Sequence, residues 1–206
     1  MKGNKKFWDF AAPVYTKVMR KNDFTFDSMA EYIKPLLSKS SSVLEVGCGT
    51  GQFTFRLASE VDSWLATDFS SGMVEQVKMR YQRLGKGVDS LEFEQSDVTS
   101  LSYEDNSFDS VLIANVLHII PEPARALDEI KRVLKPSGVL IAPTFVFEGN
   151  HNKLQLALMW LIGFRMYSKW SELKFSQFVS EVGFRVESSK LFDAKPLHEC
   201  VLVARK

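Results

Sequence analysis

The chain has 206 residues, with 26 basic against 25 acidic side chains and a formal net charge of +1. These values describe one ordinary globular domain that is long enough to bury a core without disulfides. The near-neutral charge and the pI of 7.7 argue against a protein that binds nucleic acid through a basic face. The two distant cysteines, Cys48 and Cys200, indicate no disulfide framework, no zinc site and a reducing compartment.

The N-terminal lysines are not followed by an apolar stretch, so no secretory signal is predicted. The longest uncharged apolar run, 154–164, is shorter than the roughly 20 residues of a membrane-spanning helix. We therefore expect a cytoplasmic protein with no stable insertion in a membrane.

Apolar spacing alternates along the chain between helical and strand-like segments, which is the pattern of βαβ units and a mostly parallel sheet. Ser70 and Ser171 are the expected N-caps of two of the helices. Helices are predicted over 26–37, 71–84, 123–134 and 171–182, the third closed by a Pro-Ser-Gly segment at 136–138. Strands are predicted at 43–46, 64–67, 91–94, 108–114, 139–143, 184–191 and 198–204.

The last two predicted strands are too close in sequence for a crossover helix, so they are expected to form a hairpin. This places one antiparallel strand near the C-terminus of an otherwise parallel sheet. The sequence therefore predicts a single α/β domain over 1–206, built on a doubly wound sheet of seven strands.

Glycines occupy every second position of the segment EVGCGTG at 45–51, directly after the first predicted strand. Glycine lets the backbone approach a ligand closely, and the N-terminus of a following helix offers free N–H groups to an anionic group. The GxGxxG pattern of nicotinamide dehydrogenases is excluded because Gln52 or Thr54 stands at the sixth position, and no GK[ST] of a P-loop follows. The spacing indicates a cofactor that carries a carboxylate or phosphate.

Residues 43–54 resemble the first motif of the class I S-adenosylmethionine-dependent methyltransferases, and the resemblance extends over about 40–142. It implies a Rossmann-like fold, S-adenosylmethionine as methyl donor, S-adenosylhomocysteine as product, and no metal. Within the first motif, it assigns Gly47, Cys48, Gly49 and Gly51 to the cofactor site, with Glu45 facing the cationic methionine end.

Four further segments of the resemblance supply cofactor contacts. Asp68, after the second strand, is implied to bind the ribose hydroxyls, as in Rossmann folds generally. Asp97 and the backbone of Val98 are implied to bind adenine. Phe69 and Met73 are implied to pack on adenine and ribose, and Asn115 to border the methionine part. The alternative is that the glycines only make turns and the acids only cap helices.

Methyl transfer from a sulfonium needs an acceptor held in line at close range more than it needs a catalytic side chain. His118 is the best-placed candidate for a general base, and the alternative is a packed histidine; His151 and His198 are weaker candidates. Tyr15 lies in an aromatic N-terminal segment that resembles those folded over the cofactor, so 1–39 is expected to form a helical cap. The alternative is an aromatic seam that only fills space.

Residues 145–170 are expected to be an insertion that forms a lid over the acceptor. Its centre, 154–167, is unusually apolar, and it can alternatively pack in the core or form a contact in a homodimer or on a membrane surface. Asn115 lacks the Pro-Pro-aromatic sequence found in methyltransferases of base or glutamine amino groups, so no nucleic-acid partner is expected.

The expected function is methylation of a small molecule on O, N or C, and resemblance to quinone-biosynthetic enzymes favours an apolar acceptor. Two alternatives stay open. One is a non-catalytic module that binds cofactor or regulates a partner, and the other is a protein or RNA methyltransferase that needs a partner subunit.

Overall fold

The computed structural model describes residues 2–85, 90–148, 164–194 and 197–206, with side chains from Lys5 onward. Its helices are α1 (Lys2–Met19), α2 (Asp23–Ile33), α3 (Thr54–Leu57), α4 (Ser71–Leu84), α5 (Pro123–Val133) and α7 (Glu172–Glu181). Its strands are β1 (Ser42–Val46), β2 (Ser63–Asp68), β3 (Leu91–Gln95), β4 (Phe108–Ile113), β5 (Leu134–Val146), β6 (Arg185–Phe192) and β7 (His198–Arg205).

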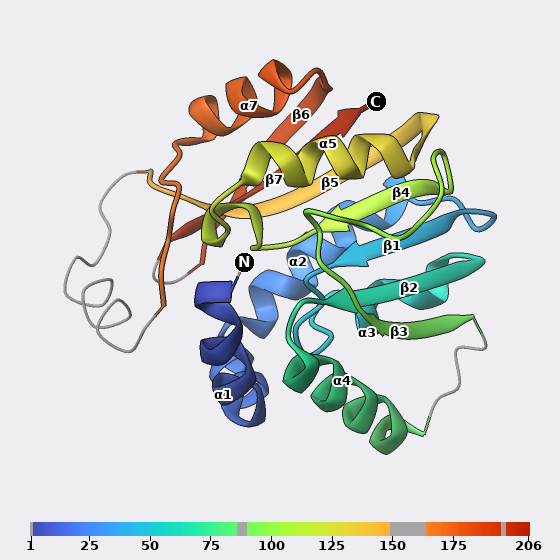
Figure 1. Ribbon diagram of the computed structural model, residues 1–206, viewed down its shortest axis with the longest axis vertical. Coiled ribbons are helices and arrows are strands. Elements are labelled where there is room, and N and C mark those ends of the chain that lie inside the picture. The colour runs from blue at the N-terminus through green and yellow to red at the C-terminus, as the bar shows by residue number, and fades with distance from the viewer. Residues whose placement is uncertain (1, 86–89, 149–163, 195–196) are drawn as a thin grey trace.

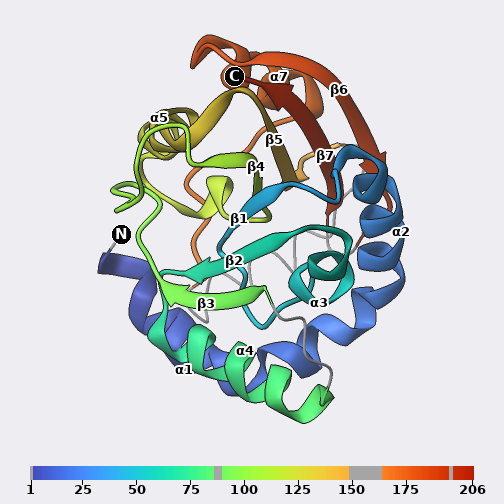
Figure 2. The same ribbon diagram turned by 90° about the vertical axis from the view of Figure 1, so that its right-hand side faces the viewer.

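The seven described strands form one sheet in the order β3-β2-β1-β4-β5-β7-β6. Neighbours from β3 to β5 pair in parallel, whereas β7 runs antiparallel to both β5 and β6. Figures 1 and 2 show helices on both faces of this twisted sheet, and two apolar clusters fill the two layers. The predicted doubly wound sheet with one antiparallel strand is confirmed.

Two predicted caps position the helices that flank the sheet. The Ser70 hydroxyl accepts from the backbone N–H of Met73 at the start of α4, and Gly85 ends that helix with a φ of 61°. Ser171 accepts in the same way from the N–H of Lys174 at the start of α7. These short-range signals could be interpreted correctly because a cap depends on only a few neighbouring residues.

Several predicted boundaries differ from the structure: the helix predicted over 26–37 is α2, Asp23–Ile33, and two further differences concern α5 and the glycine loop. β5 begins at Leu134, so the segment 136–138 lies inside the strand instead of closing α5. The reason is tertiary: Leu134 is fully buried and pairs with Phe108, and the register of β4 against β5 then shifts. The helix expected directly after the glycines is the single turn α3, which begins only at Thr54.

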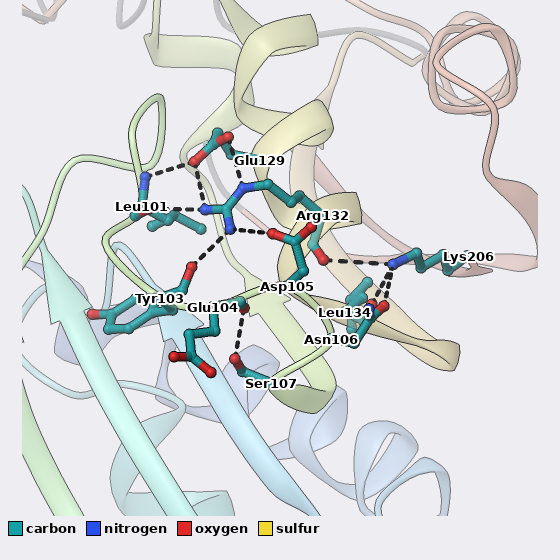
Figure 3. Close-up of polar contacts among 10 residues, drawn as sticks. All are labelled: Leu101, Tyr103, Glu104, Asp105, Asn106, Ser107, Glu129, Arg132, Leu134 and Lys206. Atoms are coloured by element: carbon teal, nitrogen blue, oxygen red, sulfur yellow. Dashed lines mark hydrogen bonds and ion pairs between the residues drawn. The ribbon is translucent and has the colours of Figure 1, made fainter.

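Arg132, at the end of α5, fastens the connection that leads into β4 (Figure 3). Its guanidinium donates to the carbonyl oxygens of Leu101 and Tyr103, at 2.8 and 2.7 Å, and to Asp105 Oδ1 at 2.8 Å. Beside it, Lys206 Nζ donates to the carbonyl oxygen of Leu134. This network lies where β4 and β5 begin, so it stabilises the edge of the sheet opposite to the carboxyl ends of the parallel strands.

Candidate functional site

A cavity lies where the carboxyl ends of β1, β2 and β4 meet α1. Doubly wound sheets bind ligands at this edge, outside the carboxyl ends of their strands. Its lining consists of Trp8, Tyr15, Val46, Gly47, Gly49, Asp68, Phe69, Met73, Ser96, Val98, Ala114, Asn115, Val116, Ile119, Ile120, Pro121 and Tyr167.

The loop after β1 brings bare backbone to this cavity. Gly47 has a φ of 72°, in the left-handed region, and a Cβ there would overlap the side chain of Val116. Gly49 has a φ of 55° and lies beside the Tyr15 ring. Both positions therefore require glycine for conformation, and Gly47 also requires it for space.

Asp68 joins the end of β2 to the same loop. Its Oδ2 accepts from the N–H of Gly49 at 2.9 Å, and its Oδ1 accepts from the N–H of Ser70 at 2.8 Å. Burial raises the pKa of Asp68 to about 6, although these two hydrogen bonds oppose the shift. The Asp68 carboxylate lines the cavity, so it can also accept from a ligand there.

Eight residues singled out from the sequence come together around this cavity, although they are spread over a hundred positions. They arrive from α1 and α4, from the ends of β1, β2 and β4, and from the loop after β3. They are Tyr15, Gly47, Gly49, Asp68, Phe69, Met73, Val98 and Asn115.

Glu45 does not face the cavity, contrary to the expectation that it meets the methionine end. Its Oε2 accepts from Thr54 Oγ1 at 2.5 Å and from Trp64 Nε1 at 2.8 Å, inside the layer beneath the glycine loop. Burial raises the pKa of Glu45 to about 7. Successive side chains of a strand point to opposite faces, and the neighbouring Val46 is the β1 side chain that lines the cavity, so Glu45 points away from it.

Three other expected cofactor residues also lie outside the lining. Asp97 Oδ1 accepts from the N–H and hydroxyl of Thr99, at 2.9 and 2.7 Å, so this carboxylate caps its own turn. Cys48 is buried in the core, and a Cβ on Gly51 would meet the Phe55 ring.

His118 is a packed histidine in this structure. Its ring is 1% exposed, Nδ1 lies 3.0 Å from Thr144 Oγ1, and the ring meets Phe145 edge to face. Burial lowers the pKa of His118 to about 3. His118 is therefore not the cavity-facing base that the sequence suggested. His198 lies 3.2 Å from the carboxylate of Asp193, and His151 is outside the described residues.

Helix α1 covers one side of the cavity with two aromatic rings. Trp8 and Tyr15 pack edge to face with their centroids 5.7 Å apart. Asp9 Oδ1 accepts from the Ser70 hydroxyl at 2.6 Å, which fastens α1 to the start of α4. Burial, together with the charges of Asp68 and Glu199, raises the pKa of Tyr15 well above its ordinary range, so its phenol stays protonated.

The sequence did not point to Glu199, which touches the cavity residue Asn115. Asn115 has a φ of 57°, and its Nδ2 donates to Glu199 Oε2 at 3.0 Å. Among the described residues, Asn115 Oδ1 and Glu199 Oε1 are buried without a hydrogen-bond partner. Burial raises the pKa of Glu199 to about 7. Only the sheet topology could have indicated Glu199, since the antiparallel strand β7 begins at the edge where β4 and β5 end.

Only the two ends of the expected lid 145–170 belong to the described residues, because 149–163 lie outside them. Phe164 contacts Trp8 edge to face at 5.9 Å. The N–H of Tyr167 donates to the carbonyl oxygen of His118 at 2.8 Å, and Tyr167 lines the cavity. The predicted lid and the alternative homodimer contact through 154–167 stay predictions.

The strand ends that form the cavity lie in a segment that matches a known protein family. Residues 44–142 match the family model described as a methyltransferase domain, a segment that contains the glycine loop, Asp68 and Asn115. Residues 44–142, just under half of the chain, therefore form a methyltransferase domain. The family match and the sheet order together confirm the resemblance drawn from the first motif.

Curated relatives of this chain share only part of their length with it. The demethylmenaquinone methyltransferase of Clavibacter sepedonicus is 39% identical over 103 residues, which is 50% of this chain and 40% of that protein. The enzyme of the same name from Lactococcus lactis subsp. lactis is 32% identical over 166 residues, 77% of this chain and 62% of that protein. The chain thus aligns with less than two thirds of either relative.

A solved structure has the same fold as this chain over nearly its whole length. The 1,6-didemethyltoxoflavin-N1-methyltransferase of Burkholderia thailandensis, solved with bound 1,6-didemethyltoxoflavin and S-adenosylhomocysteine, superposes with a TM-score of 0.75. It covers 97% of this chain and 87% of that one at 20% identity, so the likeness concerns the fold alone.

Among the described residues, no helix is long and apolar enough to span a membrane, and no group of three or more His, Cys, Asp or Glu suits a metal ion.

Proposed function

We propose that the chain transfers a methyl group from S-adenosylmethionine to a small, apolar, electron-rich acceptor of the quinol type. The observation that carries this proposal is the composition of a single cavity. One part of its lining is polar, with the glycine loop, Asp68 and Asn115, and another is an apolar wall that includes Trp8 and Ile120.

The residues present fit the cofactor that the family implies. At Gly47 a Cβ would fill the space beside Val116, so the loop offers a ligand bare backbone there. Asn115 Oδ1, buried without a partner among the described residues, suits a hydrogen-bond donor. Asp68, a carboxylate at the wall of the cavity, suits hydroxyl donors.

Each part of the cofactor then has an assigned partner. Asp68 would accept from the ribose hydroxyls, while Phe69, Met73 and Val98 would pack against the adenosine. Asn115 and the backbone of Gly47 would border the methionine part. The cofactor supplies an electrophilic methyl group on a positively charged sulfur, and it leaves as S-adenosylhomocysteine.

The protein contributes position and a dry cavity, and the acceptor contributes the nucleophile. The titratable side chains among the described lining residues are Tyr15, Asp68 and Tyr167. The Tyr15 phenol stays protonated, and both Asp68 oxygens already accept backbone hydrogen bonds. This arrangement favours an acceptor that is nucleophilic without a protein base, for which close, in-line positioning is the main requirement.

The apolar wall and the curated relatives support the quinol type of acceptor. Two curated relatives that carry the name demethylmenaquinone methyltransferase align with 50% and 77% of this chain. Within the same proposal, residues 1–39 act as a cap over the cofactor, because α1 presents Trp8 and Tyr15 to the cavity. Residues 145–170 act as the lid over the acceptor, and a small-molecule partner is sufficient for activity.

Calorimetric titration of S-adenosylhomocysteine tests the cofactor part of the proposal. Asp68→Ala should weaken binding at least about tenfold, because it removes hydrogen bonds made to a charged group. The matched control is Asp109→Asn, whose carboxylate pairs with Lys135 and the N–H of Ser42 away from the cavity. Equal affinity of wild type and Asp68→Ala would refute the assigned site.

Transfer of a labelled methyl group to a reduced, short-chain demethylated naphthoquinone tests the acceptor part. We expect transfer to this compound and none to polar phenols of similar size. Cofactor binding without transfer to the quinol would refute the acceptor class. Cofactor binding with no transfer to any acceptor would support the alternative of a non-catalytic cofactor-binding module.

A further inference from the structure

The solvent-facing side of α1 carries a stripe of apolar side chains. Phe10, Val14 and Val18 are 85%, 57% and 50% exposed. Their spacing of four residues places them on one face of the helix, which differs from the face that carries Trp8 and Tyr15. Single exposed apolar residues are common at protein surfaces, but a row of three along one helix is a feature that needs a partner.

Cationic side chains surround this stripe. Residues 5–22 contain five basic side chains and one acidic one, so their net charge is 5 − 1 = +4, against +1 for the whole chain. The single acid, Asp9, is turned toward the Ser70 hydroxyl at 2.6 Å and pairs with Lys5 at 2.8 Å. The basic side chains that are exposed in this segment are Lys6, Lys17, Arg20 and Lys21.

A groove between α1 and α4 extends the positive charge. Figures 1 and 2 both show these two helices side by side along one side of the molecule. Four basic side chains from α1, the turn that follows it and α4 line the groove, and none of its described lining residues is acidic: Pro13, Thr16, Lys17, Arg20, Gln76, Arg80, Arg83 and Leu84. Burial, and then the guanidinium of Arg56, lowers the pKa of Arg80, while the carboxylate of Asp23 opposes this shift.

We propose that α1 docks the protein on the surface of an anionic lipid bilayer. Helices that lie in a membrane interface present apolar side chains, often Trp, Phe or Leu, to the acyl boundary and Lys or Arg to the headgroups. The exposed face of α1 has this composition, with Phe10, Val14 and Val18 between four cations. Charge complementarity favours anionic lipid as the partner of this face of α1, because an apolar protein surface would leave Lys17 and Arg20 without counter-charges.

This mode of docking gives one helix two tasks. The outer face of α1 meets the lipid, while Trp8 and Tyr15 on its inner face line the cavity. An apolar acceptor dissolved in the bilayer would then need to travel only past α1 to reach the cavity. That last step rests on the proposed function, whereas the docking itself does not.

Co-sedimentation of the full chain with lipid vesicles tests the proposal. One set of vesicles contains phosphatidylcholine alone, and in the other about a third of the lipid is phosphatidylglycerol. We expect binding to the anionic vesicles only. Lys17→Gln with Arg20→Gln should weaken it about 25-fold, since each cation near such a surface contributes about fivefold. Phe10→Ser with Val14→Ser should abolish the binding that persists at high salt.

The matched control lies on α7, which also exposes an apolar and a basic side chain. Leu173→Ser with Lys174→Gln should bind vesicles like the wild type, because Leu173 is 66% exposed but far from α1. Titration with S-adenosylhomocysteine verifies that each variant is folded and is independent of the acceptor. Equal binding to both vesicle types, no binding to either, or unchanged binding of Lys17→Gln with Arg20→Gln would overturn the proposal.

Discussion

Asn115 Nδ2 donates a hydrogen bond to Glu199 Oε2 at 3.0 Å, and this contact joins the end of β4 to the beginning of β7. Burial raises the pKa of Glu199 from 4.5 to about 7. A raised folded-state pKa means that the contribution of Glu199 to stability is present below pH 4.5 and is lost as the pH rises through about 7.

Glu199→Gln should therefore become more stable relative to the wild type as the pH rises from 5 to 8. The gain should reach at most about 3 kcal/mol in the free energy of unfolding, because one pKa unit corresponds to about 1.4 kcal/mol. Urea unfolding at both pH values measures it. Glu187→Gln is the control, since Glu187 forms surface pairs with Arg185 and Arg205 and should show little change. An equal difference at pH 5 and pH 8 would refute the shifted pKa of Glu199.

Gly47→Ala should weaken binding of S-adenosylhomocysteine at least about tenfold, because the new Cβ overlaps Val116 at the wall of the cavity. The matched control is Gly85→Ala. Gly85 also has a positive φ, 61°, but nothing lies within 4 Å of its Cβ position. That variant should lose about 1 kcal/mol of stability and keep its affinity. Adding Val116→Ala to Gly47→Ala should recover part of the affinity, and no recovery would contradict the steric argument.

The predictable part of the site consists of short-range signals at strand ends. The glycine spacing, Asp68 after β2 and Asn115 after β4 were each readable from a few residues, because parallel strands all end at the same edge of the sheet. Ser70 and Gly85 marked the bounds of α4 for the same local reason.

The remaining features depend on contacts that no local pattern contains. Glu45 was assigned to the site because it precedes the glycines, but the alternation of β1 directs its carboxylate toward Trp64. His118 follows β4 and yet packs inward against Thr144 of β5. Glu199 reaches the site only because β7 inserts antiparallel between β5 and β6. These contacts between strands could not be predicted from local sequence patterns.

Glu45→Ala should destabilise the fold by roughly 2–4 kcal/mol, because it leaves the Thr54 hydroxyl and the Trp64 N–H buried without an acceptor. Glu45→Gln keeps an acceptor oxygen and should cost much less. Both variants, when folded, should bind S-adenosylhomocysteine with nearly wild-type affinity in calorimetry. A tenfold loss of affinity in Glu45→Gln without loss of stability would show that the carboxylate does serve the cofactor.

His118 should influence stability at low pH, not the rate of transfer. Burial lowers its pKa from 6.5 to about 3, so its contribution to stability is present above about pH 6.5 and is lost as the pH falls toward 3. Replacing the contacting pair by His118→Phe with Thr144→Val should flatten the fall in unfolding free energy between pH 6.5 and 4, measured by urea unfolding. His198→Gln, at the partly exposed pair with Asp193, is the control and should keep the wild-type slope. A transfer rate that follows a single ionisation near pH 6.5 in the wild type, and loses it in the double variant, would instead restore His118 as the base.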